Sequence, residues 1–440
     1  MAASETAALR VRDGRHPDAP QQKDLDKCVH CGLCLNACPT YRELGVEMDS
    51  PRGRIYQMVQ IATGAVAMND EYVRHMDLCL ACRACETACP SGVQYGKLIE
   101  AARTELNAIR PKSWLQSTVE NFAFNTLLPS RPLLKLMGGG LYLYQVLGLQ
   151  SLVRATGVLK LIGLDRVEQL TPTAEMPTFF GSIGQVFPAE GERRYKVALM
   201  AGCMQNIFFA RLNDATVRVL RKNGCEVHVP AAQTCCGALA AHSGYRDTAR
   251  RMARQNIDVL LDAGFDALIS NTGGCGSTLK EYHELFEQEA AYHDKAHRFV
   301  KLMKDVNEFL GSIELNPKLG AIPVTVTYQD SCHLAHGQKV TKPPRALMQK
   351  IPGLTFEEMP NSNICCGSAG IYNVVQNEMA LEILESKMRN VNMTKATRIV
   401  SSNPGCMLQL RAGEKLHGQG RPVQHVVELL DESYSAYGKG

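Results

Sequence analysis

The first of two matching stretches that decide the fold is Cys28-Val29-His30-Cys31-Gly32-Leu33-Cys34-Leu35-Asn36-Ala37-Cys38-Pro39. Its spacing returns in Cys79-Leu80-Ala81-Cys82-Arg83-Ala84-Cys85-Glu86-Thr87-Ala88-Cys89-Pro90. Both follow the C-x2-C-x2-C-x3-C-P pattern of bacterial ferredoxins, whose thiolates hold cubane [4Fe–4S] clusters. The two-residue gaps bring three thiolates around one cube, whereas the fourth cysteine lies where the chain leads away and ligates the other cluster.

This crossed arrangement predicts two ligand sets. We expect the first cluster to be held by Cys28, Cys31, Cys34 and Cys89, and the second by Cys38, Cys79, Cys82 and Cys85. Zinc also binds C-x2-C pairs, but a tetrahedral zinc site does not account for a third evenly spaced cysteine and a Cys-Pro in both stretches. The sequence therefore predicts two iron–sulfur clusters.

Composition indicates an ordinary globular protein of two or three domains. The chain has 440 residues, of which 45% are apolar and 21% charged. A net charge of +4 is too weak to indicate nucleic-acid binding. The 17 cysteines are grouped in metal-ligand spacing without a secretory signal, which predicts a reducing, cytoplasmic location. No apolar window is long enough to predict a spanning helix.

Shifts in composition divide the chain into five parts. We expect a flexible tail over residues 1–22 and a helical, two-cluster ferredoxin-type domain over 23–110. A helical connector and linker, residues 111–191, follows. Residues 192–318 and 319–435 then form two repeated α/β modules, so the predicted fold combines a helical domain with two parallel sheets.

A helix is predicted between the two ferredoxin-type stretches, where Ser50 is suited to cap the first turn and Pro51 to begin it. Arg52 and Arg54 lie in this first turn. Either arginine could donate to cluster sulfurs or meet a partner. We favour solvated or salt-bridged side chains.

The connector contains a leucine-rich, broken stretch over residues 122–164. One interpretation is an amphipathic surface that contacts a membrane or a partner subunit. The other is a pair of short helices buried against the next domain. Because the basic face needed for lipid binding is thin, we favour buried helices or a protein partner over lipid.

The second half of the chain is an internal duplication. Its predicted strands recur as 194–200 with 324–328 and 265–270 with 397–401. A cysteine follows the first strand, a Cys-Cys-Gly sequence lies in a later loop, and a last cysteine follows another strand. Matched cysteines are 129, 130 and 131 residues apart. Such loops, at the carboxyl ends of parallel strands, are where open sheets place ligands.

Each repeat thus gathers four thiols: Cys203, Cys235, Cys236 and Cys275 in the first, and Cys332, Cys365, Cys366 and Cys406 in the second. Adjacent cysteines can face one metal across a sharp turn, which the following glycine permits. The functional interpretation is a metal centre in each repeat, either iron–sulfur or zinc. The alternative is a set of buried free thiols. Cys225 has no counterpart and is interpreted as an ordinary core thiol.

Three histidines lie beside candidate ligands. His333 and His336 follow Cys332 and could orient a sulfur or relay a proton, so His333 is a weak catalytic candidate. The first repeat has Met204 and Ile207 at the matched positions. His30 is interpreted as a hydrogen-bond donor near the first cluster.

A double ferredoxin module followed by two Cys…Cys-Cys-Gly…Cys modules resembles the iron–sulfur subunits of glycolate oxidase. The group includes subunits of heterodisulfide reductase and lactate-utilisation iron–sulfur proteins. The stretches that carry the resemblance are 31–34, 51–56, 89–93 and 365–370. It implies an electron-transfer subunit that serves an FAD-containing partner oxidising glycolate or D-lactate, and that passes electrons toward quinone. The chain contains no dinucleotide-binding G-x-G-x-x-G motif after a strand.

The chain departs from this group in one respect. Heterodisulfide reductase modules end in a C-x-x-C pair, whereas Thr272 and Asn403 stand at the earlier position here. This makes direct disulfide reduction doubtful, although a catalytic reductase of a disulfide-like substrate stays the alternative function. A zinc-stabilised docking scaffold is a third hypothesis. The protein could lie at the inner face of the cell membrane. It would then contact the membrane either directly, through residues 122–164, or by way of a partner subunit.

Overall fold

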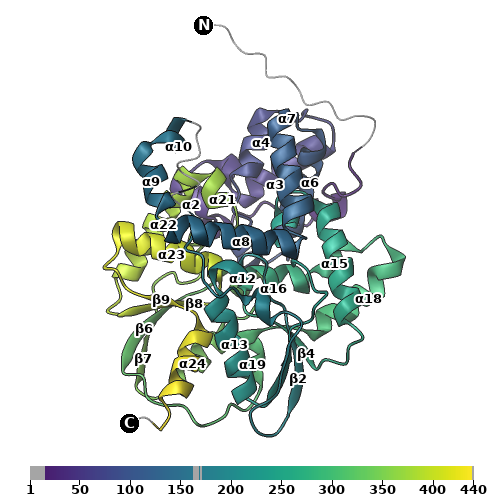
Figure 1. Ribbon diagram of the computed structural model, residues 1–440. Coiled ribbons are helices and arrows are strands. Elements are labelled where there is room, and N and C mark those ends of the chain that lie inside the picture. Colours follow the sequence, from purple (N-terminus) through teal and green to yellow (C-terminus); the bar gives the residue numbers. More distant parts are fainter. Residues whose placement is uncertain (1–14, 162–167, 169–170, 439–440) are drawn as a thin grey trace.

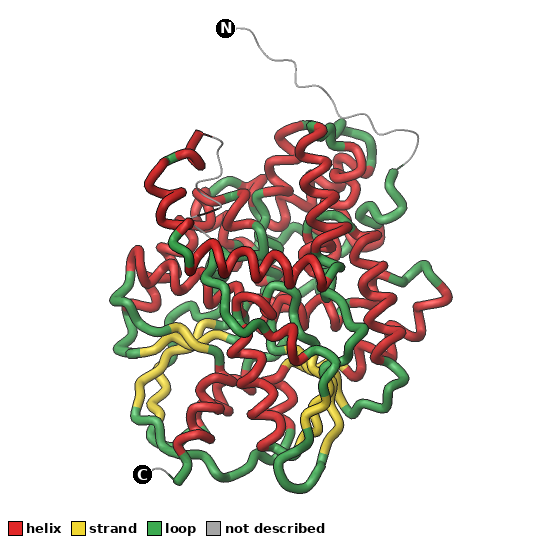
Figure 2. The backbone as a smooth tube through the Cα atoms, viewed as in Figure 1, coloured by secondary structure: helices red, strands yellow, loops and turns green. Residues whose placement is uncertain are grey.

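The computed structural model describes residues 15–161, 168 and 171–438. Helices form one half of the molecule and two separate sheets lie in the other half, with further helices between them (Figure 1, Figure 2). The described residues confirm the predicted combination of a helical domain and two α/β modules.

The N-terminal domain is built from short helices around the two cysteine-rich loops. Its elements are α1 (Gln22–Leu25), η1 (Leu35–Ala37), α2 (Pro39–Leu44), η2 (Glu47–Asp49), α3 (Pro51–Ala62), α4 (Asp70–Asp77), α5 (Ala84–Thr87) and α6 (Tyr95–Ile109). The predicted start of α3 is confirmed, because Ser50 caps it by accepting a hydrogen bond from the Gly53 N–H. Apolar residues of α3, α4 and α6 form the core of this domain.

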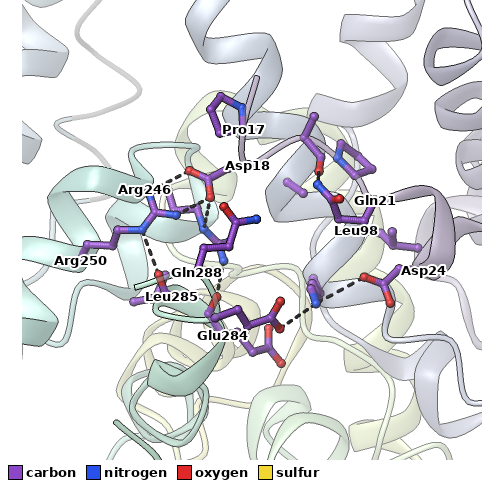
Figure 3. A pocket seen from close by; sticks show the side chains of 15 residues that line it. Pro17, Asp18, Gln21, Asp24, Leu98, Arg246, Arg250, Glu284, Leu285 and Gln288 are labelled. Carbon is purple, nitrogen blue, oxygen red and sulfur yellow. Dashed lines mark hydrogen bonds and ion pairs between the residues drawn. The ribbon is translucent and has the colours of Figure 1, made fainter. Parts of the chain in front are cut away.

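The segment before α1 packs against two domains. Arg15 binds Glu105 on α6. Asp18 binds Arg246 and Arg250 of the first repeated module (Figure 3). Residues 15–20 are therefore not a free tail, because these ion pairs and the burial of Ala19 fix them. The remainder of the predicted tail, residues 1–14, lies outside the described part of the chain.

The connector contains α7 (Trp114–Asn121), the π-helical η3 (Phe122–Leu127), α8 (Arg131–Val146), α9 (Leu149–Thr156) and α10 (Val158–Leu161). Helix α8 crosses the front of the molecule in Figure 1 and packs through Leu134 against Ile207 of the first module. Its other face is open, with Leu136 73% exposed and Val146 62% exposed. Only one side of the helix is buried, so the expectation of buried helices is only half met.

The first module has a five-stranded sheet in the order β1-β3-β2-β4-β5. Its strands are β1 (Val186–Phe187), β2 (Tyr195–Leu199), β3 (Cys225–His228), β4 (Ala267–Ser270) and β5 (Met303–Asp305). All pairings are parallel except β1 with β3. Strand β1 comes from the predicted linker, which therefore contributes an edge strand. The short 3-10 helix η4 (Phe179–Ser182) precedes it.

The second module has a four-stranded parallel sheet in the order β7-β6-β8-β9. Its strands are β6 (Val324–Gln329), β7 (Leu354–Glu357), β8 (Arg398–Ser401) and β9 (Val423–Gln424). This order repeats β3-β2-β4-β5 of the first module. The predicted duplication is thus present in the sheet topology.

Helices of both modules connect these strands and cover the sheets. In the first module they are α12 (Gln205–Phe208), α13 (Ala210–Lys222), α14 (Ala238–His242), α15 (Arg246–Leu260), α16 (Gly273–Lys280), α17 (Tyr282–Leu285), α18 (Ala290–Leu302) and α19 (Val306–Ser312). In the second they are η5 (His333–Gly337), α20 (Lys342–Gln349), α21 (Tyr372–Val375), α22 (Asn377–Asn392), α23 (Pro404–His417) and α24 (Val426–Ala436).

The two modules share one hydrophobic core. Helix α13 of the first packs on α24 of the second, and α19 packs on α20. Both α19 and α24 begin with a capping box, formed by Asp305 with Glu308 and by His425 with Glu428. The repeats therefore agree in their helix ends as well as in their strands.

Among the described residues, no helix has the length and apolar content needed to cross a bilayer.

Candidate metal centres

The first ferredoxin-type loop gathers its predicted ligands near the surface. Burial, together with the nearby thiols of Cys89 and Cys31, raises the pKa of Cys28, and Cys34 packs in the same cluster of side chains. Cys31 is exposed, whereas the other three thiols are half-buried. The fourth member of the set, Cys89, comes from the second stretch, as the crossed arrangement requires.

The second loop encloses its predicted ligands. Cys38, Cys79, Cys82 and Cys85 are all buried and line one pocket. Arg54 and Tyr95 line the same pocket, and the Tyr95 hydroxyl donates to Cys79 Sγ over 3.7 Å. The structure thus brings together each of the two predicted sets. Their roles as ligands stay predictions.

Two residues in each loop adopt left-handed backbone conformations at matched positions. They are His30 (φ 54°) and Gly32 (φ 84°) in the first loop, and Ala81 (φ 51°) and Arg83 (φ 66°) in the second. This conformation turns the backbone N–H groups inward. The His30 N–H donates to Cys28 Sγ, and the Ala81 N–H donates to Cys79 Sγ over 3.3 Å. Donors aimed at sulfur favour thiolates and metal–thiolate groups.

Burial works against the thiolate form in the second loop. Desolvation, together with neighbouring thiols, raises the pKa of Cys82 and of Cys85 well above the usual value. The buried guanidinium of Arg54 supplies a compensating positive charge at this pocket. A metal that replaces the thiol protons would relieve the cost of burying thiolates.

The first module places its four thiols around the carboxyl edge of its sheet. Cys203 follows β2, Cys235 and Cys236 follow the loop after β3, and Cys275 lies in the first turn of α16 after β4. Cys203 Sγ is 3.4 Å from Cys235 Sγ, and Cys236 contacts both Cys235 and Cys275. Gly237 needs its φ of 82° for this turn, and a Cβ there would lie 3.2 Å from the Ala249 backbone.

The second module repeats this arrangement. The thiols of Cys332 and Cys366 contact Cys365, and Cys366 also contacts Cys406, which lies in the first turn of α23 after β8. Gly367, at φ 89°, makes the same close approach to Ala380 on α22. The predicted gathering of four thiols is therefore present in both repeats.

The first cysteine of each Cys-Cys-Gly sequence, Cys235 or Cys365, has the most strongly lowered pKa in its module, and we call it the middle thiol. Hydrogen bonds from the Cys203 and Cys236 thiols hold the pKa of Cys235 well below its usual value. The thiols of Cys332 and Cys366 do the same to the pKa of Cys365. Hydrogen bonds from Cys366 and Asn403 also lower the pKa of Cys406 in the second module. A lowered pKa favours the thiolate, which is the form that binds metals.

The two residues that replace a C-x-x-C cysteine take other roles. The Asn403 side chain donates to Cys406 Sγ over 3.2 Å and accepts from the Gly274 N–H over 3.2 Å. Thr272 donates to Gln205 Oε1. Asn403 therefore links the thiols of the second module to helix α16 of the first.

The second module lies directly against the second ferredoxin-type loop. Cys82 and Leu80 pack in one cluster with Cys332, Cys365 and Tyr372. The Tyr372 hydroxyl donates to the Leu78 carbonyl over 2.9 Å. In contrast, the first module's thiols pack against the connector residues Phe124 and Leu128.

His333 contacts the ferredoxin-type loop. Its Nε2 donates to the Ala81 carbonyl over 3.1 Å, and its ring meets the His242 ring edge-on at 5.1 Å. Burial lowers the pKa of His333 to about 4, so the ring is neutral near pH 7. His336 contacts Thr87 and the Asn363 carbonyl. No described contact gives either ring a proton-relay role, which stays a prediction.

Other sequence expectations can be placed directly. His30 donates to sulfur through its backbone, and its side chain is exposed. Arg52 and Arg54 are salt-bridged, to Glu47 and Asp49. Cys225 is fully buried on β3, in the apolar core.

Lys387 is a functional candidate that the sequence analysis missed. It is 1% exposed, faces the thiols Cys365 and Cys366, and donates to the carbonyls of Asn361 and Ser362. Burial lowers its pKa to about 8, so it is still mainly charged at pH 7. The only clue in the sequence is a lysine on the apolar face of a helix. Asp330 is the one carboxylate whose charge acts on Lys387, and no ion pair of Lys387 forms within 4 Å among the described residues. A buried cation of this kind fits a site that holds negative charge.

These donor sets fit iron–sulfur clusters, which supply one-electron transfer when bound. Each site offers four thiols, and all four sites have backbone N–H groups or a buried cation near the sulfurs. Among the described residues, no group of three or more His, Cys, Asp and Glu side chains is preformed for a single metal ion. The kind of metal in the two repeated modules stays a prediction.

Comparison with known protein families accounts for most of the chain. Residues 24–93 match the 4Fe–4S dicluster domain, and residues 197–280 and 326–411 both match the cysteine-rich CCG domain. Residues 115–171 match the linker region of the glycolate oxidase iron–sulfur subunit. These matches confirm the two-cluster domain and the repeated modules, and we use the name CCG module for the repeats below.

Full-length relatives agree with these matches. The chain is 39% identical over 418 residues to a probable glycolate oxidase iron–sulfur subunit of Bacillus subtilis, covering 93% of this chain and 94% of the relative. It is 31% identical over 415 residues to the glycolate oxidase iron–sulfur subunit of Escherichia coli, with the same coverage. Lactate utilization protein A of Halalkalibacterium halodurans is 29% identical over 239 residues, 54% of this chain and 96% of that protein. The chain belongs to the family of glycolate oxidase iron–sulfur subunits.

Proposed function

We propose that this chain is the iron–sulfur electron-transfer subunit of a complex that oxidises a 2-hydroxy acid, glycolate or D-lactate. An FAD-containing partner subunit would oxidise the acid, and this chain would carry the electrons toward quinone. The observation that supports this proposal best is the grouping of 16 cysteines into four sets, two of which meet at a domain interface. The names of the relatives agree with it.

The residues of the chain would hold and insulate the clusters. Cysteine thiolates bind the iron, backbone N–H groups and Arg54 stabilise their charge, and the apolar cores around them exclude water. Buried surroundings and hydrogen bonds to sulfur both set cluster potentials. The chain's contribution is thus positioning and electrostatics.

The first ferredoxin-type loop is the most accessible of the four sites. Cys31 is exposed, and Val29 and Leu33 beside it are 67% and 63% exposed. We place the contact with the flavoprotein at this loop, because electron transfer requires close approach. A Val29→Asp, Leu33→Asp double variant should slow cluster reduction by the partner and leave the iron content unchanged. Unchanged kinetics would argue against this location.

The proposed location is the cytoplasm, at the inner face of the cell membrane. The open face of α8 and α9, with Leu136, Leu143 and Leu152 each more than half exposed, supports contact with a membrane or with a membrane-bound partner. The described cations on α8 and α9 are few, and Arg154 is paired with Glu168. This favours a protein partner.

The deciding experiment is an anaerobic pull-down of the tagged chain from its native cells, with flavin assayed in the eluate. We expect a stoichiometric flavoprotein, and bleaching of the clusters by glycolate or D-lactate only when it is present. A flavin-free eluate that reduces disulfides would instead support the alternative of a CCG-type reductase.

A further inference from the structure

The two ferredoxin-type loops have the same internal geometry. In each, the second residue after the first cysteine, His30 or Ala81, has a positive φ and directs its N–H at the sulfur of that cysteine. A non-glycine residue in this conformation is strained and persists only when its surroundings hold it. What holds each residue is therefore part of the metal site.

The residue that holds the carbonyl differs between the loops. The His30 carbonyl accepts a hydrogen bond from Arg52 Nη1 over 3.0 Å, and Arg52 belongs to the same domain. The Ala81 carbonyl accepts from His333 Nε2 over 3.1 Å, and His333 belongs to the second CCG module. Because a carbonyl oxygen only accepts, the proton of the neutral ring lies on Nε2.

Other contacts hold the second loop from the same side. The Tyr372 hydroxyl donates to the carbonyl of Leu78, the residue before Cys79. Thr87, two residues after Cys85, shares a hydrogen bond with His336 of the second CCG module. Cys82 packs against Cys365 between these points. At the first loop, Ala37 packs against the same apolar cluster, but no hydrogen bond from a CCG module reaches described residues 28–38.

We propose that His333 is a positioning residue for the second ferredoxin-type cluster, which the second CCG module thereby completes. By holding the Ala81 carbonyl, His333 keeps the Ala81 N–H directed at Cys79 Sγ. Hydrogen bonds to sulfur stabilise the more negative, reduced form of a cluster. This inference deepens the proposed function, since it assumes that the second thiol set holds its cluster.

The test uses the full-length, anaerobically purified chain with its clusters. Variants His333→Phe and His333→Gln are titrated with a chemical reductant while the cluster signals are followed by electron paramagnetic resonance. We expect His333→Phe to lower the midpoint potential of one ferredoxin-type signal and leave the other unchanged. His333→Gln, which keeps an N–H donor of similar reach, should restore most of the shift.

Arg52→Met is the matched variant for the first loop. It should lower the midpoint potential of the first ferredoxin-type cluster and leave that of the second unchanged. The proposal is overturned if His333→Phe leaves both signals unchanged at full iron content, or if it moves both equally. If His333→Phe does not accumulate folded, Tyr372→Phe replaces it. That variant removes one hydroxyl from the same interface and should shift the same signal by less, and an unchanged signal would again overturn the proposal. No partner subunit is involved, so this outcome is separate from a failure to find the flavoprotein.

Discussion

The two CCG modules share a topology but hold the ferredoxin-type domain by different forces. The first module uses ion pairs, of Asp18 with Arg246 and Arg250, of Lys97 with Glu287 and of Arg83 with Glu281. A hydrogen bond between Glu100 and His242 adds to them. The second uses hydrogen bonds, including one from Ser386 to the Glu43 carboxylate, and an apolar cluster around Tyr372. Among the described residues, no ion pair joins the second module to residues 15–110. One repeat is thus attached electrostatically and the other by close packing.

The modules also differ beside their thiols. Gly237 and Gly367 contact Ala249 and Ala380 in the same way, so the helices that carry these alanines can be aligned. Seven residues further along, the first module has the neutral amide of Asn256 where the second has Lys387. Asn256 donates to the Cys235 carbonyl and to Tyr282. Duplication preserved the four thiols, whereas the charge beside them changed.

Replacing the middle thiol should give the largest effect and separate the modules. We expect Cys235→Ser and Cys365→Ser each to lose the metal of its own module. Only Cys365→Ser should also alter the signal of the second ferredoxin-type cluster, because Cys365 packs against Cys82. Iron and zinc analysis with paramagnetic resonance measures both effects. Equal disturbance of the ferredoxin-type signals by the two variants would contradict the asymmetry.

Removing the buried charge should have the next largest effect. Two unit charges about 8 Å apart at an effective dielectric constant of about 20 interact by ~2 kcal/mol, and for one electron this is about 90 mV. Lys387→Met should therefore lower the potential of the second module's centre by several tens of millivolts. The first module's centre in the same protein is the internal reference. An equal change in the potentials of both centres would show that Lys387→Met disturbs the fold, and that the charge of Lys387 is not the cause.

The two kinds of attachment should respond differently to salt. Asp18→Asn removes the ion pairs of Asp18 with Arg246 and Arg250, and leaves Arg250 paired with the exposed Asp247. It should cost about 1–3 kcal/mol of stability at low salt. Tyr372→Phe removes one hydrogen bond and should cost about 0.5–1.5 kcal/mol. Denaturation at low and high salt distinguishes them, since screening should reduce only the Asp18→Asn effect. The same salt dependence for both variants would refute the distinction.

The smallest expected effect is an acid sensitivity confined to the first module. Burial disfavours ionised Glu100, but its hydrogen bond with His242 and nearby positive charges lower its pKa from 4.5 to about 2. Below about pH 4.5 the unfolded chain therefore binds a proton that the folded chain does not, and stability falls with pH. Hydrogen exchange of α14 between about pH 6 and 4 should rise more in the wild type than in Glu100→Gln. An equal rise would exclude Glu100 as the cause.

The elements that the sequence predicted correctly are those determined by residues near them in the chain. The cysteine spacing, the Ser50 cap of α3 and the central strands β2, β4, β6 and β8 all depend on nearby residues. The short strands β1, β5, β7 and β9 were missed, because each is defined by its pairing with a distant neighbour.

Contacts between domains likewise could not be predicted from the sequence. The four thiols of each set were identified by spacing, but the partner of His333 was not, because Ala81 is 252 residues away. The same holds for Lys387, whose burial depends on how α22 packs. From the periodicity alone, one lysine on the apolar face of a helix cannot be recognised as a buried functional residue.

The crossed packing of α13 on α24 and of α19 on α20 has the form of an isologous dimer contact made within one chain. In each repeat the helix after the first cysteine meets the last helix of the other repeat, and the reverse contact is also made. A single repeat on its own would expose this apolar layer and would need a second copy to cover it. The duplicated half therefore behaves as a fused homodimer, and the one ferredoxin-type domain attached to it breaks a two-fold symmetry that the sheets still retain.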